Sequence, residues 1–508
     1  MKKLIILFVI ALAMPKLNAQ DLTDVLRYSQ SEIQGTARYR ALSGAFGALG
    51  GDMSAVSINP AGSAVFSQSQ ASISGGILDV TNDTQYFGGL VSTNDSYFNI
   101  NQGGASFVFR NNDTSSPWRK FTIGVAYDRT NSHDDSWSAL GTNTNGNNNF
   151  DNTIAGYFFD NAEGLPLGDI STREGESIAD AYGDIGAAFG FRHQQAFLGF
   201  ESFILEPEDI DDDNNTEYLI NLENGNFTHN YSYLSKGYNG KIAVNMSAQY
   251  GDNLYLGLNL NSHFIDFQRA TSLFETNSNG GLINEIDFRN TLISTGGGFS
   301  FQLGGIVKLT KELRLGVTYD SPTWYTIQEE TTQFLDTNEL AAQDLDVIDP
   351  QIVNIYPEYK IQTPAQVRGS LAYVFGKQGL ISFDYSRKDY SSATFNPSAD
   401  FANENNQINN LLTVASTYRL GGEYKHEQFS FRGGYRFEES PYVNGLTVGD
   451  LDGYSLGIGY NFGNTKLDIT YDQSNRSFQT PLFNQGLTSP VSIDRVNSNI
   501  TMTLSFNI

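Results

Sequence analysis

The chain has 508 residues, no cysteine and a formal net charge of −25. The acidity excludes a nucleic-acid-binding surface, and the lack of cysteine excludes disulfides, thiol chemistry and lipid attachment through a cysteine. The 50 glycines, 27 tyrosines and 35 phenylalanines, together with a negative mean hydropathy, suit strands that are apolar on one face only.

Residues 1–19 have the layout of a secretory signal peptide. Lys2 and Lys3 precede an apolar core, and Leu17-Asn18-Ala19 stands before Gln20 as a cleavage site. We therefore expect an exported protein of a Gram-negative envelope. After this leader no apolar run reaches about 18 residues, so a membrane protein would have to be a β-barrel. A water-soluble β protein is the alternative that composition leaves open.

A segment rich in small residues, Gly35 to Val65, follows the leader. Its apolar residues do not alternate, and Asn59-Pro60-Ala61-Gly62 has the composition of a turn, in which Gly62 permits positive φ. Asp52 precedes an expected short helix. We therefore predict a compact plug over residues 20–66. The glycines do not form G-x-G-x-x-G and no apolar strand precedes them, which argues against a dinucleotide site.

From Ser69 onward the sequence becomes a series of segments of about ten residues in which apolar and polar residues alternate. Leu254, Leu256, Leu258 and Leu260 share one face of such a segment. A soluble sandwich shows the same alternation. However, short turns at one end and long connections at the other are typical of a transmembrane, antiparallel, up-and-down barrel. The expected long connections are Asp79–Ser96, Arg129–Gly237, Arg269–Asn290, Pro322–Thr363, Arg387–Asn410, Glu438–Asp452 and Gln473–Ile493.

Counting these segments gives an all-β barrel of fourteen strands, and one region leaves the count open. Gly186 to Leu205 read as a hairpin would give sixteen strands. Read at helical spacing, the same region has an apolar stripe, which we favour. The stripe would lie in the longest external loop, residues 130–236, where exposed apolar side chains would form a groove for an apolar ligand. Its residues are Phe197, Phe200, Phe203 and Ile204.

Four motifs carry a resemblance to a known family. The stretch GAFGALGGDMSAVSINPAGSA in the plug resembles the N-terminal hatch of the FadL/TodX family of outer-membrane transporters. Three further motifs follow in the family's order: Leu315 to Pro322, Thr363-Pro364-Ala365 with Leu371-Ala372-Tyr373, and Arg432 to Pro441. The resemblance covers most of the mature chain. It implies a monomeric barrel, residues 67–508, that is plugged by a hatch at residues 20–66.

The resemblance also implies a function. The family passes hydrophobic compounds, such as long-chain fatty acids or aromatic hydrocarbons, across the outer membrane and its lipopolysaccharide without an energy source. A kink in the third strand, here Phe121 to Asp128, provides a lateral exit beside the hatch, and Gly124 would ease a bulge there. Packing of Gly124 against the plug is the alternative. The expected gating residues of the hatch are Asp52, Asn59, Pro60, Ala61 and Gly62.

Two other functions stay open at this point. The first is a non-transporting barrel of the same fold that scaffolds or shuttles a protein partner in secretion or envelope assembly. The second is a porin-like open channel, against which the plug argues. A collapsed polar lumen would favour the accessory role, whereas a lumen walled by apolar side chains would favour transport.

Motifs for other chemistry are incomplete. Asp209, Asp211 and Asp213 have the first spacings of a calcium loop, but Asn214 replaces its glycine and Ile220 its glutamate. The five histidines show no metal-ligand spacing. A hydrolase would need a serine and histidine pair, for which Ser300 and His263 lie on neighbouring hairpins without a supporting pattern. We therefore expect no enzyme, no cofactor and no metal.

Overall fold

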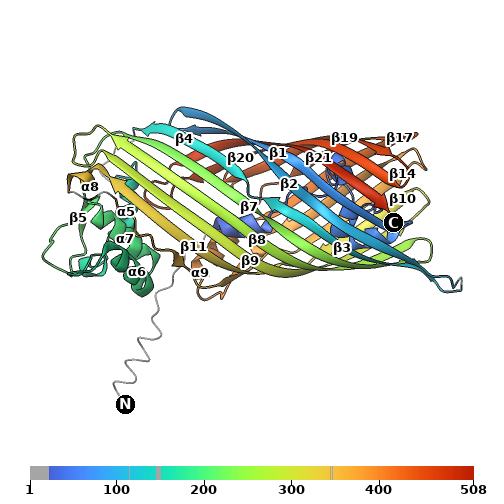
Figure 1. Cartoon of the computed structure of the whole chain (residues 1–508), viewed down its shortest axis with the longest axis horizontal. Helices are drawn as coiled ribbons and strands as arrows, with labels where there is room; N and C mark the ends of the chain where they lie inside the picture. The colour runs from blue at the N-terminus through green and yellow to red at the C-terminus, as the bar shows by residue number, and fades with distance from the viewer. Residues whose placement is uncertain (1–21, 114, 145–149, 344, 346) are drawn as a thin grey trace, which may run out of the picture.

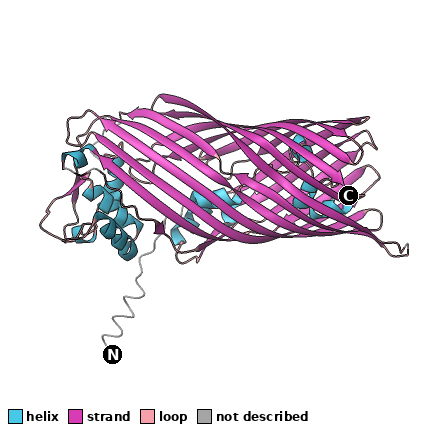
Figure 2. Ribbon diagram, in the orientation of Figure 1, coloured by secondary structure: helices cyan, strands magenta, loops and turns pink. Residues whose placement is uncertain are grey.

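The structure is a computed structural model that describes residues 22–508 except 114, 145–149, 344 and 346 (Figure 1 and Figure 2). The predicted signal peptide lies outside the described residues. The strands wind around the long axis as a tube, with helices inside it and a group of helices at one end (Figure 2). No helix in the described ranges is both long and apolar enough to cross a bilayer.

Nineteen strand segments of the described chain form one sheet, which closes because β1 pairs with both β2 and β21. Segments that continue one another across a break count as one barrel strand, so this closed antiparallel barrel has fourteen strands, as predicted. In order they are β1 (Gln70–Tyr86), β2 (Gly89–Arg110), β3 (Trp118–Ser132) with β4 (Asp135–Asn143), β7 (Phe227–Tyr250), β8 (Leu254–Asn277), β9 (Glu285–Lys308), β10 (Leu313–Asp320) with β11 (Trp324–Thr337), β12 (Asn354–Ile355) with β13 (Tyr359–Gln362) and β14 (Gln366–Val374), β15 (Gly379–Asp389) with β16 (Thr394–Asn396), β17 (Val414–His426), β18 (Phe429–Glu438), β19 (Val448–Asn461), β20 (Thr465–Pro481) and β21 (Pro490–Asn507).

Side chains alternate between the outer and inner faces of the barrel. On β8, Leu256 and Leu260 face outward with 43% and 42% of their surface exposed, whereas Tyr255 and Asn259 are buried inside. At the end of the barrel with the short turns, Trp118 and Tyr250 pack edge to face with ring centroids 5.0 Å apart. An apolar outer surface bordered by aromatic residues is the surface that a bilayer requires of a barrel.

Most strands are longer than the predicted ten residues. β7, β8 and β9 have 24 residues each. The predicted connection Asp79–Ser96 is wrong, because β1 and β2 continue through it as a hairpin closed at Phe87-Gly88. The predicted connection Pro322–Thr363 likewise contains β11, β12 and β13. The outward-facing residues of these extensions are mostly polar, as at Thr81, Asp83 and Gln85, because the strands continue past the apolar band, although Val80, Ile327 and Leu335 are buried on the inner side.

The connection between β4 and β7 forms a small helical domain at the end opposite the short turns (Figure 1). We call it the cap. Most of the region Gly186 to Leu205 is helical, up to Glu201, which confirms the helical interpretation over the hairpin. The cap contains α5 (Ile154–Ala162), η2 (Leu167–Asp169), α6 (Ile178–Phe189), α7 (Phe191–Glu201) and the hairpin of β5 (Leu205–Pro207) and β6 (Tyr218–Ile220), and other long connections carry α8 (Asn338–Ala342), η3 (Tyr390–Ser392) and α9 (Ala402–Leu411).

The cap is tied to the barrel by a buried carboxylate. Thr153 is the N-cap of α5, and its side chain accepts a hydrogen bond from Ala155 N. Glu275 on β8 accepts hydrogen bonds from the Thr153 hydroxyl and from Ile154 N, the latter at 2.9 Å. His229 Nε2 lies 2.9 Å from the same carboxylate. A negative charge at the first turn of a helix is favourable, so Glu275 fixes where α5 begins.

The N-terminal part of the described chain runs through the interior of the barrel. It contains α2 (Leu22–Ser29), α3 (Ala37–Ala41), α4 (Met53–Ile58) and η1 (Pro60–Val65). α3 packs on β19, β20 and β21, whereas η1 packs on β7, β8 and β9 across the lumen. We call Leu22 to Phe66 the hatch. It contacts nearly opposite walls of the barrel and therefore crosses the bore.

Candidate functional site

The predicted gating residues of the hatch are joined by hydrogen bonds. Asp52 is the N-cap of α4, and its Oδ1 accepts from Ser54 N at 2.9 Å and from the Thr36 hydroxyl at 2.6 Å. Thr36 is in turn the N-cap of α3. The two hatch helices therefore begin at one shared cluster of capping residues, which keeps this segment compact without a large core.

Asn59 connects the hatch to the barrel wall. Its Oδ1 accepts from Ala61 N at 3.1 Å and caps η1, and its Nδ2 donates to the carbonyls of Gly47 and Gly305 at 2.7 and 3.2 Å. Pro60 occupies the first turn of η1, where a missing N–H costs nothing. Gly305 belongs to β9, so Asn59 holds both the hatch turn and the wall.

The expectation of positive φ at Gly62 is wrong. Gly62 lies inside the 3₁₀ helix η1, and the positive φ values of the hatch fall at Gly35, Ser43, Gly44, Gly50 and Gly51. Gly62 instead allows η1 and α4 to approach each other closely, because a Cβ at this position would lie 2.8 Å from Ala55 Cβ. Its carbonyl accepts from Gly51 N at 3.2 Å, so this glycine packs one turn of the hatch against the next.

Inward-facing glycines of the barrel make room for the hatch. A Cβ on Gly304 would lie 2.1 Å from Asn59 Oδ1, and one on Gly257 would lie 2.3 Å from the Pro60 carbonyl carbon. Sequence reasoning missed these positions, although glycine pairs inside strands were the available signal. The set that meets hatch atoms this closely is Gly257, Gly304, Gly316, Gly421, Gly434 and Gly457.

Polar side chains on the inner wall complete the seat of the hatch. Asp384 Oδ2 accepts from the backbone nitrogens of Phe46 and Gly47 at 3.0 and 2.9 Å. Arg40 of the hatch forms a two-pronged ion pair with Asp472 at 2.8 Å on both prongs. Charge-assisted hydrogen bonds of this kind are stronger than neutral ones, so the hatch is held by specific contacts and not only by its fit.

Gly124 lies in a regular part of β3. It pairs with Ser106 of β2 and with Asn245 of β7, so the expected bulge at Gly124 is wrong. Within the described part of β3 the irregularities fall between Trp118 and Lys120 and between Arg129 and Asn131. Both irregularities border the hatch, since Lys120 Nζ donates to the Phe66 carbonyl at 2.6 Å and the Thr130 carbonyl accepts from Glu32 N at 3.0 Å, and the second lies six positions beyond the glycine.

The β2–β3 ladder is interrupted at this bulge, and beyond it β4 packs against β2 through side-chain contacts such as that of Ser136 with Asp95. The β2–β3 ladder ends at Gln102 and Asp128, and no ladder partner for residues 89–101 of β2 other than β1 is seen among the described residues. Arg129 bridges β2 and β3 at the point where the two strands separate. Its guanidinium donates to Asn99 on β2, to Asp134 at 3.2 Å and to the Gly237 carbonyl at 3.3 Å. We call this region the β2–β3 junction.

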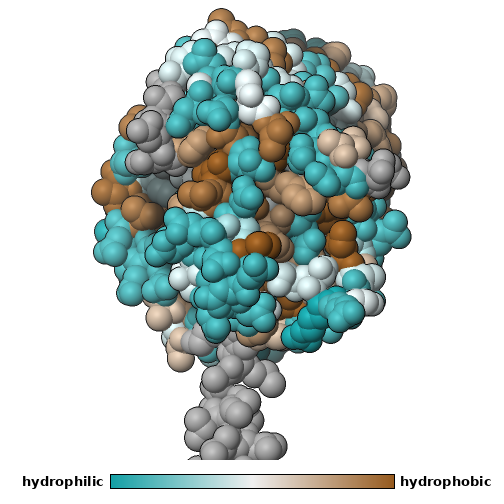
Figure 3. All heavy atoms as spheres, turned by 90° about the vertical axis from the view of Figure 1, so that its left-hand side faces the viewer, coloured by the Kyte–Doolittle hydropathy of each residue, from teal (hydrophilic) through white to brown (hydrophobic). Residues whose placement is uncertain are grey.

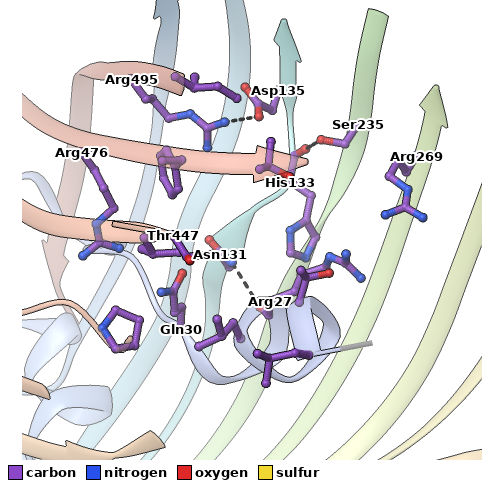
Figure 4. Close-up of a pocket in the computed structure, with 18 of the residues that line it drawn as sticks. Arg27, Gln30, Asn131, His133, Asp135, Ser235, Arg269, Thr447, Arg476 and Arg495 are labelled. Carbon is purple, nitrogen blue, oxygen red and sulfur yellow. Dashed lines mark hydrogen bonds and ion pairs between the residues drawn. The ribbon is translucent and has the colours of Figure 1, made fainter. Parts of the chain in front are cut away.

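A cavity of about 910 Å³ lies between the hatch and the cap end of the barrel. Apolar lining comes from Leu26 and Phe267, and the junction contributes Asn131 and His133. Figure 4 shows Arg476 and Arg495 on one wall and Arg269 on the other, with Arg27 and Gln30 of the hatch between them. The lumen is therefore neither collapsed nor uniformly apolar.

A second cavity of about 180 Å³ lies beside the hatch and is lined by Asp128, Arg129 and Thr130. Its wall brings together the serine and histidine that the sequence placed on neighbouring hairpins. Ser300 Oγ lies 2.8 Å from His263 Nε2 and accepts from Asn261 Nδ2 at 3.1 Å. His263 Nδ1 faces the Tyr325 hydroxyl at 3.3 Å, where a catalytic triad has a carboxylate or an amide.

The predicted external groove is not formed as expected. Phe197 and Ile204 are fully buried in the core of the cap, and Phe200 and Phe203 are half-buried against it. The expectation of an exposed stripe is wrong because the cap packs onto the end of the barrel and shares one hydrophobic core with it, to which Phe227, Phe288 and Leu335 of the strands contribute. Figure 3 shows this end of the molecule, where apolar residues reach the surface as patches among polar ones. A role of these four residues in ligand capture stays a prediction.

Comparison with known proteins finds one family model and several similar structures. The model described as outer membrane protein transport protein (OMPP1/FadL/TodX) matches residues 216–506. No curated protein sequence matches. A FadL homologue from Pseudomonas aeruginosa shares 12% identity, with 94% of this chain and 99% of that chain covered and a TM-score of 0.55. The toluene transporter TodX of P. putida shares 12% identity, with the same shares covered and a TM-score of 0.51. At these identities the two structures show a common fold.

Proposed function

The chain belongs to the OMPP1/FadL/TodX family of outer-membrane transport proteins of Gram-negative bacteria, and from this premise we propose that it takes up hydrophobic compounds by a lateral route. A compound enters at the cap end, occupies the large cavity, and leaves through the barrel wall at the β2–β3 junction into the bilayer. Such a route avoids the sugar layer of lipopolysaccharide and a crossing through free water.

The observation that carries this proposal is the meeting of cavity, hatch and interrupted β2–β3 ladder at one place. The large cavity is lined by Asn131 to Asp135, and the small one by Asp128 to Thr130. The hatch reaches the same residues, since Asn131 Nδ2 donates to the Arg27 carbonyl at 3.5 Å (Figure 4). A ligand in the cavity therefore lies beside residues 89–101 of β2. Among the described residues, this part of β2 pairs with β1 and has no ladder partner on its other side.

The hatch supports a lateral route over an axial one. Its contacts with nearly opposite walls close the bore, and leaving along the axis would require breaking the ion pair of Arg40 and the hydrogen bonds of Asn59 and Asp384. Opening the junction requires the loss of the Arg129 contacts and of side-chain contacts between β4 and β2, such as that of Ser136 with Asp95, but leaves the ion pair of Arg40 and the hydrogen bonds of Asn59 in place.

The accessory role in secretion or envelope assembly is supported less well. That role predicts a polar, collapsed lumen, whereas a cavity of about 910 Å³ with leucine, phenylalanine and tryptophan in its lining is present. A porin-like channel is disfavoured by the hatch that crosses the bore.

Uptake into cells tests the proposal. A labelled long-chain fatty acid and a labelled aromatic hydrocarbon are supplied to cells with the gene, without it, and with the gene carrying Asp384→Ala. We expect uptake of at least one compound to depend on the gene. Equal uptake of both compounds with and without the gene would reject transport.

A further inference from the structure

The lining of the large cavity carries an excess of positive charge in a strongly acidic chain. Eight of its lining residues are arginine or lysine and five are aspartate or glutamate, while the whole chain has a net charge of −25. A solvated surface would be expected to share the sign of the chain. The basic lining residues are Arg27, Arg40, Arg269, Lys388, Arg419, Arg436, Arg476 and Arg495.

Several of these cations are already neutralised. Arg40 pairs with Asp472 at 2.8 Å, and Arg495 pairs with Asp135. A different group, on β17, β18 and β20, has only one carboxylate for three arginines. There Arg419, Arg436 and Arg476 surround the single carboxylate of Glu438, and we call these four residues the arginine cluster.

Glu438 engages its three arginines only loosely. The nitrogen to oxygen distances are 3.6 Å to Arg419, 3.5 Å to Arg436 and 3.6 Å to Arg476, all beyond ordinary hydrogen-bond length. Glu438 Oε1 and the Nε atoms of Arg419 and Arg476 are buried without a hydrogen-bond partner among the described residues. Three guanidinium groups offer up to about fifteen N–H donors, so donors exceed the acceptors of one carboxylate by a wide margin.

The charge around the cluster also leaves a surplus. Lys388 lines the same part of the cavity, where its Nζ donates to the Ser29 carbonyl at 2.8 Å. Glu439 is the other lining carboxylate nearby, and it accepts from Ser416 N at 2.8 Å. Asp320, Asp384 and Asp472 also attract these cations from beside the cavity, together with Arg368 and Arg40. The six cations then exceed the five carboxylates by one positive charge. A buried surplus of this kind is costly without a counter-charge.

We propose that the arginine cluster and Lys388 bind the dianionic headgroup of an amphipathic ligand, a phosphate monoester, whose apolar part lies against the leucine and phenylalanine lining of the cavity. This inference rests on the proposed function. A phosphate monoester carries nearly two negative charges near neutral pH, which a net positive wall attracts strongly, and its three terminal oxygens accept the bidentate hydrogen bonds that arginine forms best. A carboxylate supplies half that charge and fewer acceptors.

Ligands of equal chain length separate the headgroup from the tail. Binding of dodecyl phosphate, dodecanoate and dodecanol to the purified barrel is measured in a non-ionic detergent, together with inorganic phosphate alone. We expect dodecyl phosphate to bind at least about tenfold more tightly than dodecanoate, and inorganic phosphate to bind more weakly than dodecyl phosphate. Dodecanoate binding as tightly as dodecyl phosphate would overturn the proposal. So would inorganic phosphate binding as tightly, because the apolar part would then contribute nothing.

Two variants with opposite expected effects assign the site. Arg476→Gln should lower the affinity for dodecyl phosphate, relative to that for dodecanol, by about tenfold or more. Glu438→Gln should raise the affinity for dodecyl phosphate, since a competing negative charge is removed. Misfolding cannot produce the second result. Arg387→Gln removes an exposed arginine of β15 and should keep the wild-type ratio. An unchanged ratio in Arg476→Gln, or weaker dodecyl phosphate binding in Glu438→Gln, would contradict the assignment.

The same measurements distinguish this inference from the proposed function. If dodecanol and dodecanoate bind and enter cells but no preference for phosphate is found, transport stands and the arginine cluster is not a headgroup site. If none of the three amphiphiles binds or enters, the proposed function itself is wrong.

Discussion

The backbone nitrogen of Glu32 donates to the carbonyl of Thr130 over 3.0 Å and thereby joins the hatch to the distorted part of β3. Thr130 is the residue that the ladder between β3 and β7 skips, so its carbonyl is available to the hatch. Ser132 N adds a contact to the Glu32 carboxylate at 3.3 Å. A movement of the hatch at Arg27 to Glu32 therefore acts directly on the β2–β3 junction.

Removing the side chain of Arg129 should loosen this junction. Arg129→Ala deletes the contacts to Asn99, Asp134 and the Gly237 carbonyl. A hydrogen bond to a charged group contributes about 1.5–3 kcal/mol to stability. We expect amide hydrogen exchange at residues 89–101 and 128–134 to become at least about tenfold faster. Lys377→Ala, in an exposed short turn, is the control. Unchanged exchange in Arg129→Ala would show that the strand edges hold the junction without this side chain.

Neighbouring glycines of β9 test how the hatch is seated. Gly304→Ala would place a Cβ 2.1 Å from Asn59 Oδ1, whereas the nearest heavy atom to a Cβ at Gly305 is 3.9 Å away. We expect Gly304→Ala to displace the hatch and to raise single-channel conductance in planar bilayers, and Gly305→Ala to leave the conductance at the wild-type level. Equal conductance of both variants and the wild type would mean that the hatch does not depend on this contact.

Asn59 should contribute more to the local stability of the hatch than an exposed asparagine contributes to the stability of its helix. Asn59→Ala removes a cap on η1 and the hydrogen bonds to Gly47 and Gly305, an expected loss of about 2–3 kcal/mol in the local stability of the hatch. The measurement is hydrogen exchange of residues 53–66 in the folded barrel. Asn409→Ala, on the exposed face of α9, is the matched control. Exchange as slow as in the wild type would argue that packing alone holds the hatch.

The cap should be released without unfolding the barrel when Glu275 is replaced. Glu275→Ala leaves the hydroxyl of Thr153 and the N–H of Ile154 buried without their acceptor, which costs about 1–3 kcal/mol for each group. Limited proteolysis should then cut between residues 150 and 226 faster, while the barrel keeps its heat-dependent mobility in gels. Glu285→Ala, at an exposed strand end, should behave as the wild type. Equal cleavage of both variants would place the anchor of the cap elsewhere.

The barrel could be predicted from the sequence because lipid imposes a strict alternation on every strand. The pattern of Leu254 to Leu260 was interpreted correctly as a strand, and the helical spacing was correct for Phe197 and Phe200, whereas Phe203 and Ile204 lie beyond the end of α7. The strand lengths were predicted too short. Residues such as Asn82 and Ser92 lie past the apolar band, where the order of apolar and polar residues does not mark a strand.

The site was harder to predict because it depends on contacts between distant residues. Asn59 and Asp52 were found through local capping chemistry, which a short sequence window contains. The bulge at Thr130 was assigned to Gly124 instead, since a glycine is the residue that usually eases a bulge. The arginine cluster was missed entirely, because its members come from three strands and their sign is visible only once the barrel closes.

The central claim is that ligand leaves the lumen sideways at the β2–β3 junction, and a block placed there tests it most directly. Asn99→Trp would fill the space beside Arg129, and Asn94→Trp, on the exposed part of the same strand, is the control. Uptake of a labelled hydrophobic compound and its binding to the purified barrel are measured for both. We predict that Asn99→Trp still binds the compound but loses most of its uptake, while Asn94→Trp keeps both. Full uptake by a folded, ligand-binding Asn99→Trp variant would contradict the lateral route.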